Sequence, residues 1–199
     1  MWNRLSGIFI ILILLVTACT PVLPSNLSTA TCDLPPVVIP TLPAEIPGYN
    51  ELDRTTGLHI TDRVQEIDLE SYRLEVSGGV DHPLSLSYDD LRCMPKIEAR
   101  LDLICPRNFL DIATWAGASL KHILDLAGVQ EGAIRIRLVS ADGYSALVPM
   151  DKALSEENFL AYEWEGEPLP ILHGFPVRAV FPGMDGMFWV KWLIKIEVH

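Results

Sequence analysis

Alternating apolar and polar positions predict a series of β-strands. Residues 72–79 alternate in this way and end in two glycines, as a strand followed by a turn does. Because side chains alternate between the two faces of a strand, each such run can bury one face against a core. Residues 99–105 alternate in the same way, and further strands are predicted over residues 134–139, 177–181 and 189–198. An Asp142-Gly143 pair after the third of these strands indicates a turn.

Helical spacing predicts three short helices. The first is predicted where four apolar residues share one helical face and a glycine follows them, at Leu120, Ile123, Leu124, Ala127 and Gly128. A second helix is expected after Ser87, a residue suited to cap a helix, with Asp90 at the third helical position. A third is predicted over residues 152–160. Strands and short helices thus alternate irregularly, which favours the α+β class with mixed sheets.

The first 18 residues have the three-part order of a secretory signal. One positive charge, Arg4, precedes an apolar run over residues 7–16, and small residues follow. The run is shorter than the roughly 20 residues that a membrane-spanning helix needs. Residues 16–19 (Val-Thr-Ala-Cys) resemble a bacterial lipobox, which predicts lipidation of Cys19. The alternatives are an ordinary signal peptide or a short membrane anchor, and all three place the rest of the chain outside the cytoplasm.

Residues 19–50 are predicted to form a tether. Seven prolines lie among serines and threonines there: Pro21, Pro24, Pro35, Pro36, Pro40, Pro43 and Pro47. Proline removes backbone hydrogen-bond donors and favours extended chain, so a semi-stiff linker is expected. The remaining residues, 51–199, are enough for a single folded domain.

The charge of the chain excludes one class of ligand. The formal net charge is −11, and removing residues 1–18 takes away only Arg4, which leaves −12. Nucleic acid is not an expected partner, because affinity for phosphate backbones comes mainly from Lys and Arg. An anionic ligand would need a local basic pocket. The four cysteines have no zinc-type spacing.

Cys105 is a candidate metal ligand because it ends a predicted strand, and positions where a strand meets a loop often carry function. A thiolate is a soft ligand, and Arg107 nearby would favour its ionised form. The alternative is a structural role, including a disulfide with Cys93 or Cys32 in an oxidising compartment.

A second group of candidates lies near the C-terminus. Arg178 is predicted on a strand flanked by two glycine-rich turns, His173 precedes it, and Lys191 is placed on the next predicted strand. Glycine permits close approach of the backbone to a ligand, and arginine binds phosphate with a planar fork. A solvated pair of strands accounts for the same residues. Likewise Tyr144 follows a turn, where it could face a pocket or pack on the core.

Taken in order, the motifs of residues 60–198 resemble the molybdopterin-binding domain of the sulfite oxidase family. The motifs are Leu-Ile-Cys-Pro (103–106), Trp-Ala-Gly-Ala-Ser-Leu (115–120), Ser-Ala-Asp-Gly-Tyr (140–144), Leu-Ala-Tyr-Glu (160–163), Gly-Glu-Pro-Leu-Pro (166–170), His-Gly-Phe-Pro-Val-Arg (173–178), Pro-Gly (182–183) and Val-Lys-Trp-Leu (190–193). Each motif alone is weak, and their order carries the resemblance. It implies the sulfite-oxidase-like fold and a molybdenum-molybdopterin cofactor.

The resemblance also implies roles for individual residues. Cys105 would bind molybdenum, while His173, Arg178 and Lys191 would hold the pterin and its phosphate. Tyr144 would face the substrate, and Asn108 and Arg107 would line the pocket, with Arg107 attracting an anion. The cofactor would carry out two-electron oxygen-atom transfer on a small substrate. Because no segment resembles the haem domain of animal sulfite oxidases, an external electron-transfer partner is expected.

Two hypotheses follow. In the first, the chain is a molybdenum oxidoreductase tethered outside the membrane. In the second, it is a cofactor-free lipoprotein that uses the same fold as a binding or scaffold module. The second is favoured by the leader, which has one arginine where folded molybdopterin enzymes are normally exported by a twin-arginine signal. A disulfide between Cys93 and Cys105 would exclude the first hypothesis.

Overall fold

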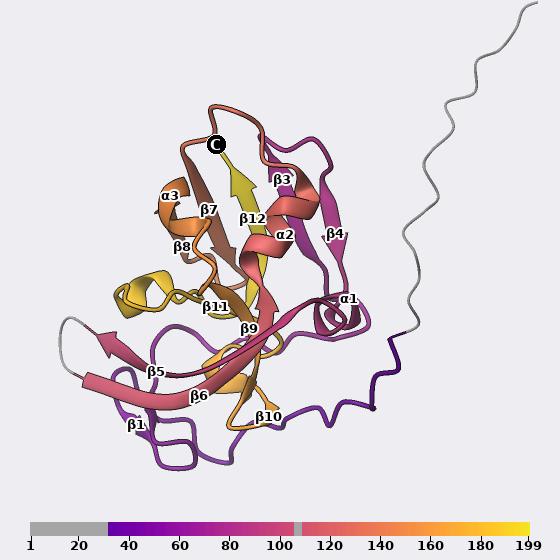
Figure 1. Cartoon of the computed structure of the whole chain (residues 1–199). Coiled ribbons are helices and arrows are strands. Elements are labelled where there is room, and N and C mark those ends of the chain that lie inside the picture. Colours follow the sequence, from indigo (N-terminus) through magenta and orange to yellow (C-terminus); the bar gives the residue numbers. More distant parts are fainter. Residues whose placement is uncertain (1–31, 106–108) are drawn as a thin grey trace, which may run out of the picture. The chain divides into compact units, whose positions relative to one another are not determined.

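The computed structural model describes residues 32–105 and 109–199 (Figure 1). The predicted leader, Cys19, Arg107 and Asn108 lie outside these residues. Asp33–His199 form one compact unit, the domain described below. Within the described residues, no helix has the length and apolar character needed to cross a membrane. Residues 33–48 contain no helix or strand, yet Val37 and Leu42 pack against the core.

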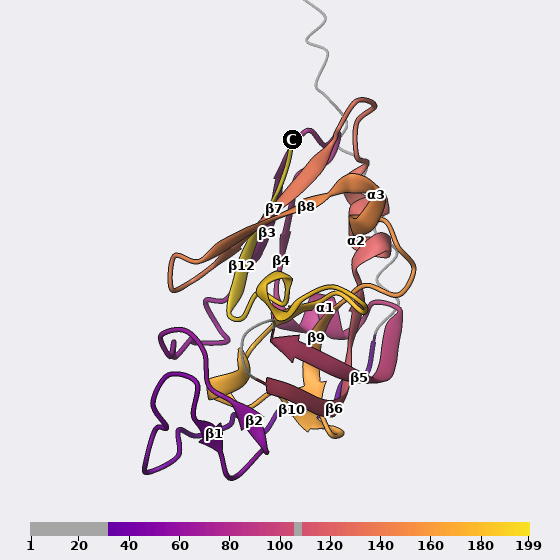
Figure 2. The ribbon, with the colours of Figure 1, turned by 90° about the vertical axis from the view of Figure 1, so that its left-hand side faces the viewer.

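Two five-stranded sheets form the domain (Figure 2). The first has the order β10–β9–β6–β5, with β11 also paired to β9. Its strands are β5 (Lys96–Cys105), β6 (Phe109–Ser119), β9 (Phe159–Trp164), β10 (Glu167–Pro168) and β11 (Arg178–Val180). All of their pairings are antiparallel. The hairpin of β5 and β6 is long, and it ends with Cys105 directly opposite Phe109.

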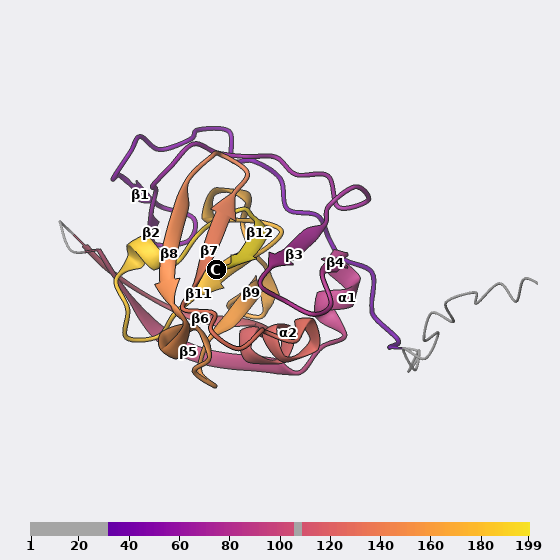
Figure 3. The same ribbon diagram turned by 90° about the horizontal axis from the view of Figure 1, so that it is seen from above.

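The second sheet has the order β4–β3–β12–β7–β8, and Figure 3 shows its strands side by side. Its strands are β3 (Leu74–Gly78), β4 (Leu84–Leu86), β7 (Arg135–Ser140), β8 (Ser145–Pro149) and β12 (Leu193–Val198). The C-terminal strand β12 pairs in parallel with β3 and antiparallel with β7. The pairing with β3 brings the last strand of the chain next to a strand more than 100 residues earlier in the sequence. One antiparallel and one mixed sheet, together with short helices, confirm the predicted α+β class.

Two helices form as the sequence predicts. Helix α1 (Tyr88–Arg92) begins at a capping box, in which Ser87 caps the backbone N–H of Asp90 and the Asp90 carboxylate accepts the N–H of Ser87. Helix α2 (Leu120–Ala127) buries the four apolar residues of its predicted face and ends at Gly128, whose φ of 66° is left-handed.

The helix predicted over residues 152–160 is wrong for most of its length. Helix α3 (Met150–Ala153) ends early, because the Asn158 side chain donates hydrogen bonds to the carbonyls of Lys152 and Ala153. Phe159 then begins β9, which lies in the first sheet.

The last predicted strand, residues 189–198, is too long at its start. Strand β12 begins only at Leu193, since Trp192 has a positive φ of 46°. Lys191 therefore lies in the turn before the strand. The prediction that placed Lys191 on the strand is wrong.

The remaining elements are short and border the site. They are β1 (Leu52–Asp53), β2 (Leu58–His59), and the 3₁₀ turns η1 (Ile171–His173) and η2 (Gly186–Phe188). Strands β1 and β2 pair only with each other.

Candidate functional site

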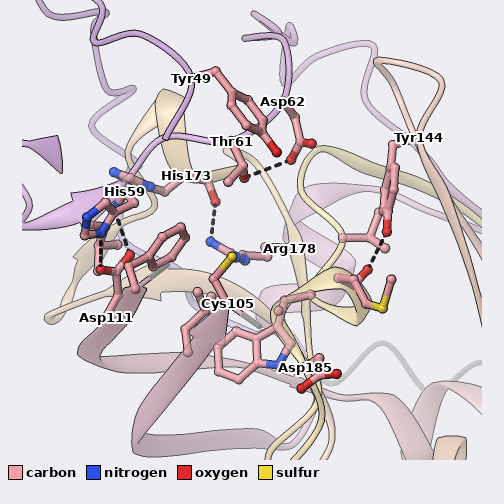
Figure 4. A pocket seen from close by; sticks show the side chains of 17 residues that line it. Tyr49, His59, Thr61, Asp62, Cys105, Asp111, Tyr144, His173, Arg178 and Asp185 are labelled. Carbon is pink, nitrogen blue, oxygen red and sulfur yellow. Dashed lines mark hydrogen bonds and ion pairs between the residues drawn. The ribbon is translucent and has the colours of Figure 1, made fainter. Parts of the chain in front are cut away.

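A cavity of about 610 Å³ opens at the tip of the β5–β6 hairpin (Figure 4). Segments far apart in sequence line it: the β2 strand, the hairpin tip, the η1 turn, strand β11 and the η2 turn. The polar and ionisable side chains of its wall are Tyr49, His59, Thr61, Asp62, Cys105, Asp111, Tyr144, His173, Arg178 and Asp185. A cavity of this size accommodates a cofactor-sized molecule.

Cys105 occupies the end of β5 and lines the cavity with a free, half-buried thiol. It forms no disulfide with Cys93 or Cys32, so the pairing that would have excluded a metal role is absent. The strand alternation explains its direction, because Leu103 and Cys105 share the inward face of β5 while Ile104 is half exposed.

Arg178 is a buried cation without an anionic partner among the described residues. Its guanidinium lies over the rings of Trp115 and Trp189, 5.0 and 5.7 Å from their centroids, and one terminal nitrogen is 3.5 Å from the His173 carbonyl oxygen. Its Nε is buried with no hydrogen-bond partner. Burial lowers the pKa of Arg178 to about 10.

His173 is fully buried and also leaves one atom without a partner. Its Nε2 lies 3.1 Å from Asp53 Oδ2 and 2.8 Å from Thr56 Oγ1, whereas its Nδ1 has no partner. Burial, together with the positive charges of Lys191 and Arg178, lowers the pKa of His173 to about 3. The ring is therefore neutral. Because the Asp53 carboxylate only accepts, the ring proton is on Nε2 and Nδ1 is a hydrogen-bond acceptor.

Asp53 and Thr56 complete this arrangement from the β1–β2 hairpin, and the sequence interpretation missed them. Although burial opposes it, hydrogen bonds from the Thr56 hydroxyl and the Thr55 backbone N–H hold the pKa of Asp53 below its ordinary value. The Asp-Arg-Thr-Thr run could have indicated a side-chain-stabilised turn. Its contact with His173, 120 residues away, has no local signal.

Lys191 lies behind the cavity wall and is not among the lining residues. Its Nζ donates hydrogen bonds to the carbonyls of Thr61 and Leu172 at 2.8 and 3.1 Å. Burial and the neighbouring Arg178 lower the pKa of Lys191 to about 7. Gly174, with a left-handed φ of 112°, lets this turn approach, since a Cβ there would lie 3.1 Å from Lys191 Cα and 3.3 Å from Arg178 Cβ.

The depressed pKa of Lys191 makes the stability of the cofactor-free protein depend on pH. Lysine has an ordinary pKa near 10.5 in the unfolded chain, so between about pH 7 and 9 the unfolded chain binds more protons than the folded one. The free energy of unfolding should therefore rise with pH over this range. Urea denaturation at several pH values should show the rise in the wild type and a flatter profile in Lys191→Met. Equal slopes in the two proteins would contradict this assignment.

Tyr144 lies at the rim of the cavity, where its hydroxyl donates a 2.8 Å hydrogen bond to the Met187 carbonyl. Partial burial, with the carboxylates of Asp62 and Asp142, raises the pKa of Tyr144, so the phenol is protonated. Its oxygen can still accept a hydrogen bond.

The site contains a second pair that the sequence interpretation missed. The His59 ring and the Asp111 carboxylate are joined by a 2.7 Å hydrogen bond, and both residues line the cavity.

These features suit a phosphate-bearing, metal-containing cofactor. The thiol supplies a soft metal ligand. Arg178 is a buried cation that lacks a counter-anion among the described residues, and burying unpaired charge is costly unless a ligand compensates it. The unpartnered Nε of Arg178 and Nδ1 of His173 offer one donor and one acceptor. The residues therefore fit the molybdopterin group that the motifs imply.

Comparison with known proteins agrees with this chemistry. The model of the oxidoreductase molybdopterin-binding domain matches residues 61–199. The chain is 36% identical over 154 residues to the uncharacterized oxidoreductase YuiH of Bacillus subtilis (strain 168), covering 76% of this chain and 77% of that one. It is also 36% identical to mitochondrial sulfite oxidase of Homo sapiens over 166 residues, which cover 68% of this chain. That match spans only 30% of the length of the human protein.

A solved structure shows the same fold. The crystal structure of the sulfane dehydrogenase SoxCD from Paracoccus pantotrophus matches with a TM-score of 0.65 and 26% sequence identity, over 68% of this chain and 40% of that chain. The sulfite-oxidase-like fold expected from the motifs is thus confirmed, as is the cofactor class. The chain belongs to the molybdopterin-binding oxidoreductases of the sulfite oxidase family, whose cofactor is molybdenum-molybdopterin.

Proposed function

We propose that the protein is a membrane-tethered, extracytoplasmic oxidoreductase that transfers an oxygen atom to or from a small substrate. The observation that carries the proposal is the shared cavity of a free thiol, Cys105, and two buried groups with unpartnered atoms, His173 and Arg178. A scaffold module that had lost its cofactor would have no use for these costly unpaired groups.

Five residues of the chain would hold the cofactor. The Cys105 thiolate would bind molybdenum, and His173 Nδ1 would accept a hydrogen bond from the pterin. Arg178 and Lys191, with Asn108 from the loop after Cys105, would hold the pterin and its phosphate. When bound, the cofactor supplies two-electron redox chemistry by oxygen-atom transfer, and the protein supplies position and electrostatics.

The substrate would meet two further residues. The Tyr144 hydroxyl donates to the Met187 carbonyl, and its oxygen would accept a hydrogen bond from the substrate at the rim. Arg107, two residues after Cys105 in the sequence, would attract an anionic group. Their roles rest on the family resemblance together with the position of Tyr144.

The location and the partner follow from the sequence. Lipidation of Cys19 would anchor the chain, and residues 19–50 would hold the domain away from the membrane surface. Electrons would pass to or from an external electron-transfer protein. The lipidated form is supported by the lipobox-like residues 16–19.

The partners of His173 give a direct test of cofactor holding. Asp53→Asn should lower pterin affinity by about 10- to 100-fold, the range found when a group that orients a ligand residue is removed. The amide no longer fixes the proton on Nε2, so Nδ1 is no longer held as an acceptor. Pterin retained after purification is the measurement, with the exposed Asp151→Asn as control. Undiminished pterin in Asp53→Asn would contradict the role of this pair.

Isotope transfer tests the reaction class. The molybdenum-loaded protein should oxidise at least one small sulfur compound with an oxidised dye as electron acceptor, in water labelled with oxygen-18. The product should carry one labelled oxygen, since oxygen-atom transfer draws that atom from water. Dye reduction with an unlabelled product would contradict the proposal.

A further inference from the structure

Asp111 holds His59 at two points in the cavity wall. The backbone N–H of His59 donates to Asp111 Oδ2 and its ring Nδ1 to Asp111 Oδ1, both at 2.7 Å. Asp111 is only 4% exposed. One carboxylate therefore fixes both the main chain and the ring of the same histidine (Figure 4).

The ring has a single orientation. It stacks on Phe109 with centroids 4.1 Å apart and planes 9° from parallel. Since a carboxylate only accepts, the proton is on Nδ1 and the lone pair is on Nε2. No hydrogen bond from the described residues reaches Nε2, and the half-buried His59 side chain forms part of the cavity wall.

Strand register places this pair beside the metal-binding cysteine. Cys105 lies opposite Phe109, and Leu103 lies opposite Asp111, in the antiparallel β5–β6 hairpin. Opposite residues share a face, so all four point into the cavity, and diagonal neighbours such as Cys105 and Asp111 are about 7–8 Å apart. The His59 ring stacks on Phe109, which lies opposite Cys105 and two residues before Asp111.

We propose that His59 is the proton-transfer residue of this cavity and that Asp111 is its positioning residue. The inference rests on the proposed oxygen-atom transfer. Oxidation of a substrate X consumes water, as X + H₂O → XO + 2 H⁺ + 2 e⁻, and the two electrons leave to the external electron-transfer protein. His59 Nε2 accepts these protons one at a time and passes each to solvent, while Asp111 stabilises the imidazolium. In the reducing direction the same atom donates them.

The other ionisable groups of the wall are less suited to this task. His173 is neutral and fully buried, Arg178 stays charged, and the Tyr144 hydroxyl is engaged with Met187. The exposed carboxylates of Asp62 and Asp185 line the same cavity as His59.

The first test needs no turnover. Nitrogen-15 NMR of the full-length protein labelled at histidine should show a protonated Nδ1 and an unprotonated Nε2 for His59. Asp111→Asn should disturb this preference, whereas Asp151→Asn should leave it unchanged. A neutral His59 ring in the wild type with its proton on Nε2 instead of Nδ1 would overturn the proposal, whether or not the protein turns over any substrate.

The second test separates proton transfer from cofactor holding. In the molybdenum-loaded protein, His59→Gln should lower kcat by about 100-fold or more, in the range of general acid–base catalysis, with molybdenum and pterin content unchanged. Added imidazole should restore part of the activity of His59→Ala. The exposed His82→Gln is the control.

Two kinetic results would overturn the proposal. One is a kcat per molybdenum within about threefold of wild type in His59→Gln, a factor far below what general acid–base groups contribute. The other is a loss of pterin that accounts for all of the lost activity, which would make His59 a cofactor-holding residue. A wild-type protein that carries molybdenum but transfers no oxygen would contradict the proposed function instead, and the NMR result would still decide the tautomer.

Discussion

Cys105→Ser should lower oxygen-transfer turnover per mole of protein by more than about 100-fold. Residues that merely orient a metal's ligands typically contribute 10- to 100-fold, and Cys105 would be a ligand itself. Serine keeps the size of the side chain but replaces a soft sulfur with a hard oxygen. The half-buried position tolerates the change, so the fold should be retained. Dye-coupled turnover, with X-ray absorption to count sulfur ligands on molybdenum, is the measurement.

A matched control comes from the same hairpin. Leu110 is 53% exposed on the outer face of β6, and Leu110→Ser should leave turnover and the sulfur count unchanged. Full activity in Cys105→Ser, or an unchanged number of sulfur ligands, would show that the thiolate does not bind the metal.

Arg178→Met should have opposite effects on cofactor binding and on stability. The guanidinium would make charge-assisted hydrogen bonds to the cofactor, each contributing about 1.5–3 kcal/mol, so pterin retention should fall by at least tenfold. In the cofactor-free protein, however, Arg178 is a buried cation with no ion pair among the described residues. Replacing such a charge with an apolar side chain of similar volume should raise the free energy of unfolding by about 1–4 kcal/mol, less the lost contacts with the two tryptophans.

The two effects are measured separately, as pterin content after purification and as urea denaturation of the cofactor-free protein. The control is Arg100→Met, because the Arg100 side chain is 66% exposed and only 3.6 Å from Glu165 in a surface ion pair. Neither quantity should change much there. A less stable cofactor-free Arg178→Met protein would show that the guanidinium stabilises the fold. It would contradict the view that Arg178 is destabilising until a ligand binds.

Local signals predicted the elements whose geometry is local. The capping box at Ser87 and the apolar face before Gly128 define α1 and α2 because both involve residues a few positions apart. Strand β6 was missed because it is a central strand whose end, from Trp115 to Ser119, is buried on both faces, so it does not alternate. The helix over residues 152–160 was wrongly predicted because the Asn158 side chain ends α3 early.

The site divides in the same way. Cys105 could be predicted from its place at a strand end, and His173 and Arg178 from their glycine-flanked motif and the family resemblance. The partners of these residues could not be predicted. Asp53 contacts His173 across 120 residues, and His59 contacts Asp111 across 52. The packing of the β1–β2 segment against the η1 turn and the β5–β6 hairpin brings these partners together.

The molybdenum and pterin content of the protein purified from its native cells tests the central claim most directly. Elemental analysis and the fluorescence of the oxidised pterin should give close to one molybdenum and one pterin per chain. Protein without either, from cells that load their other molybdoenzymes normally, would contradict the claim that this cavity holds a working molybdenum cofactor.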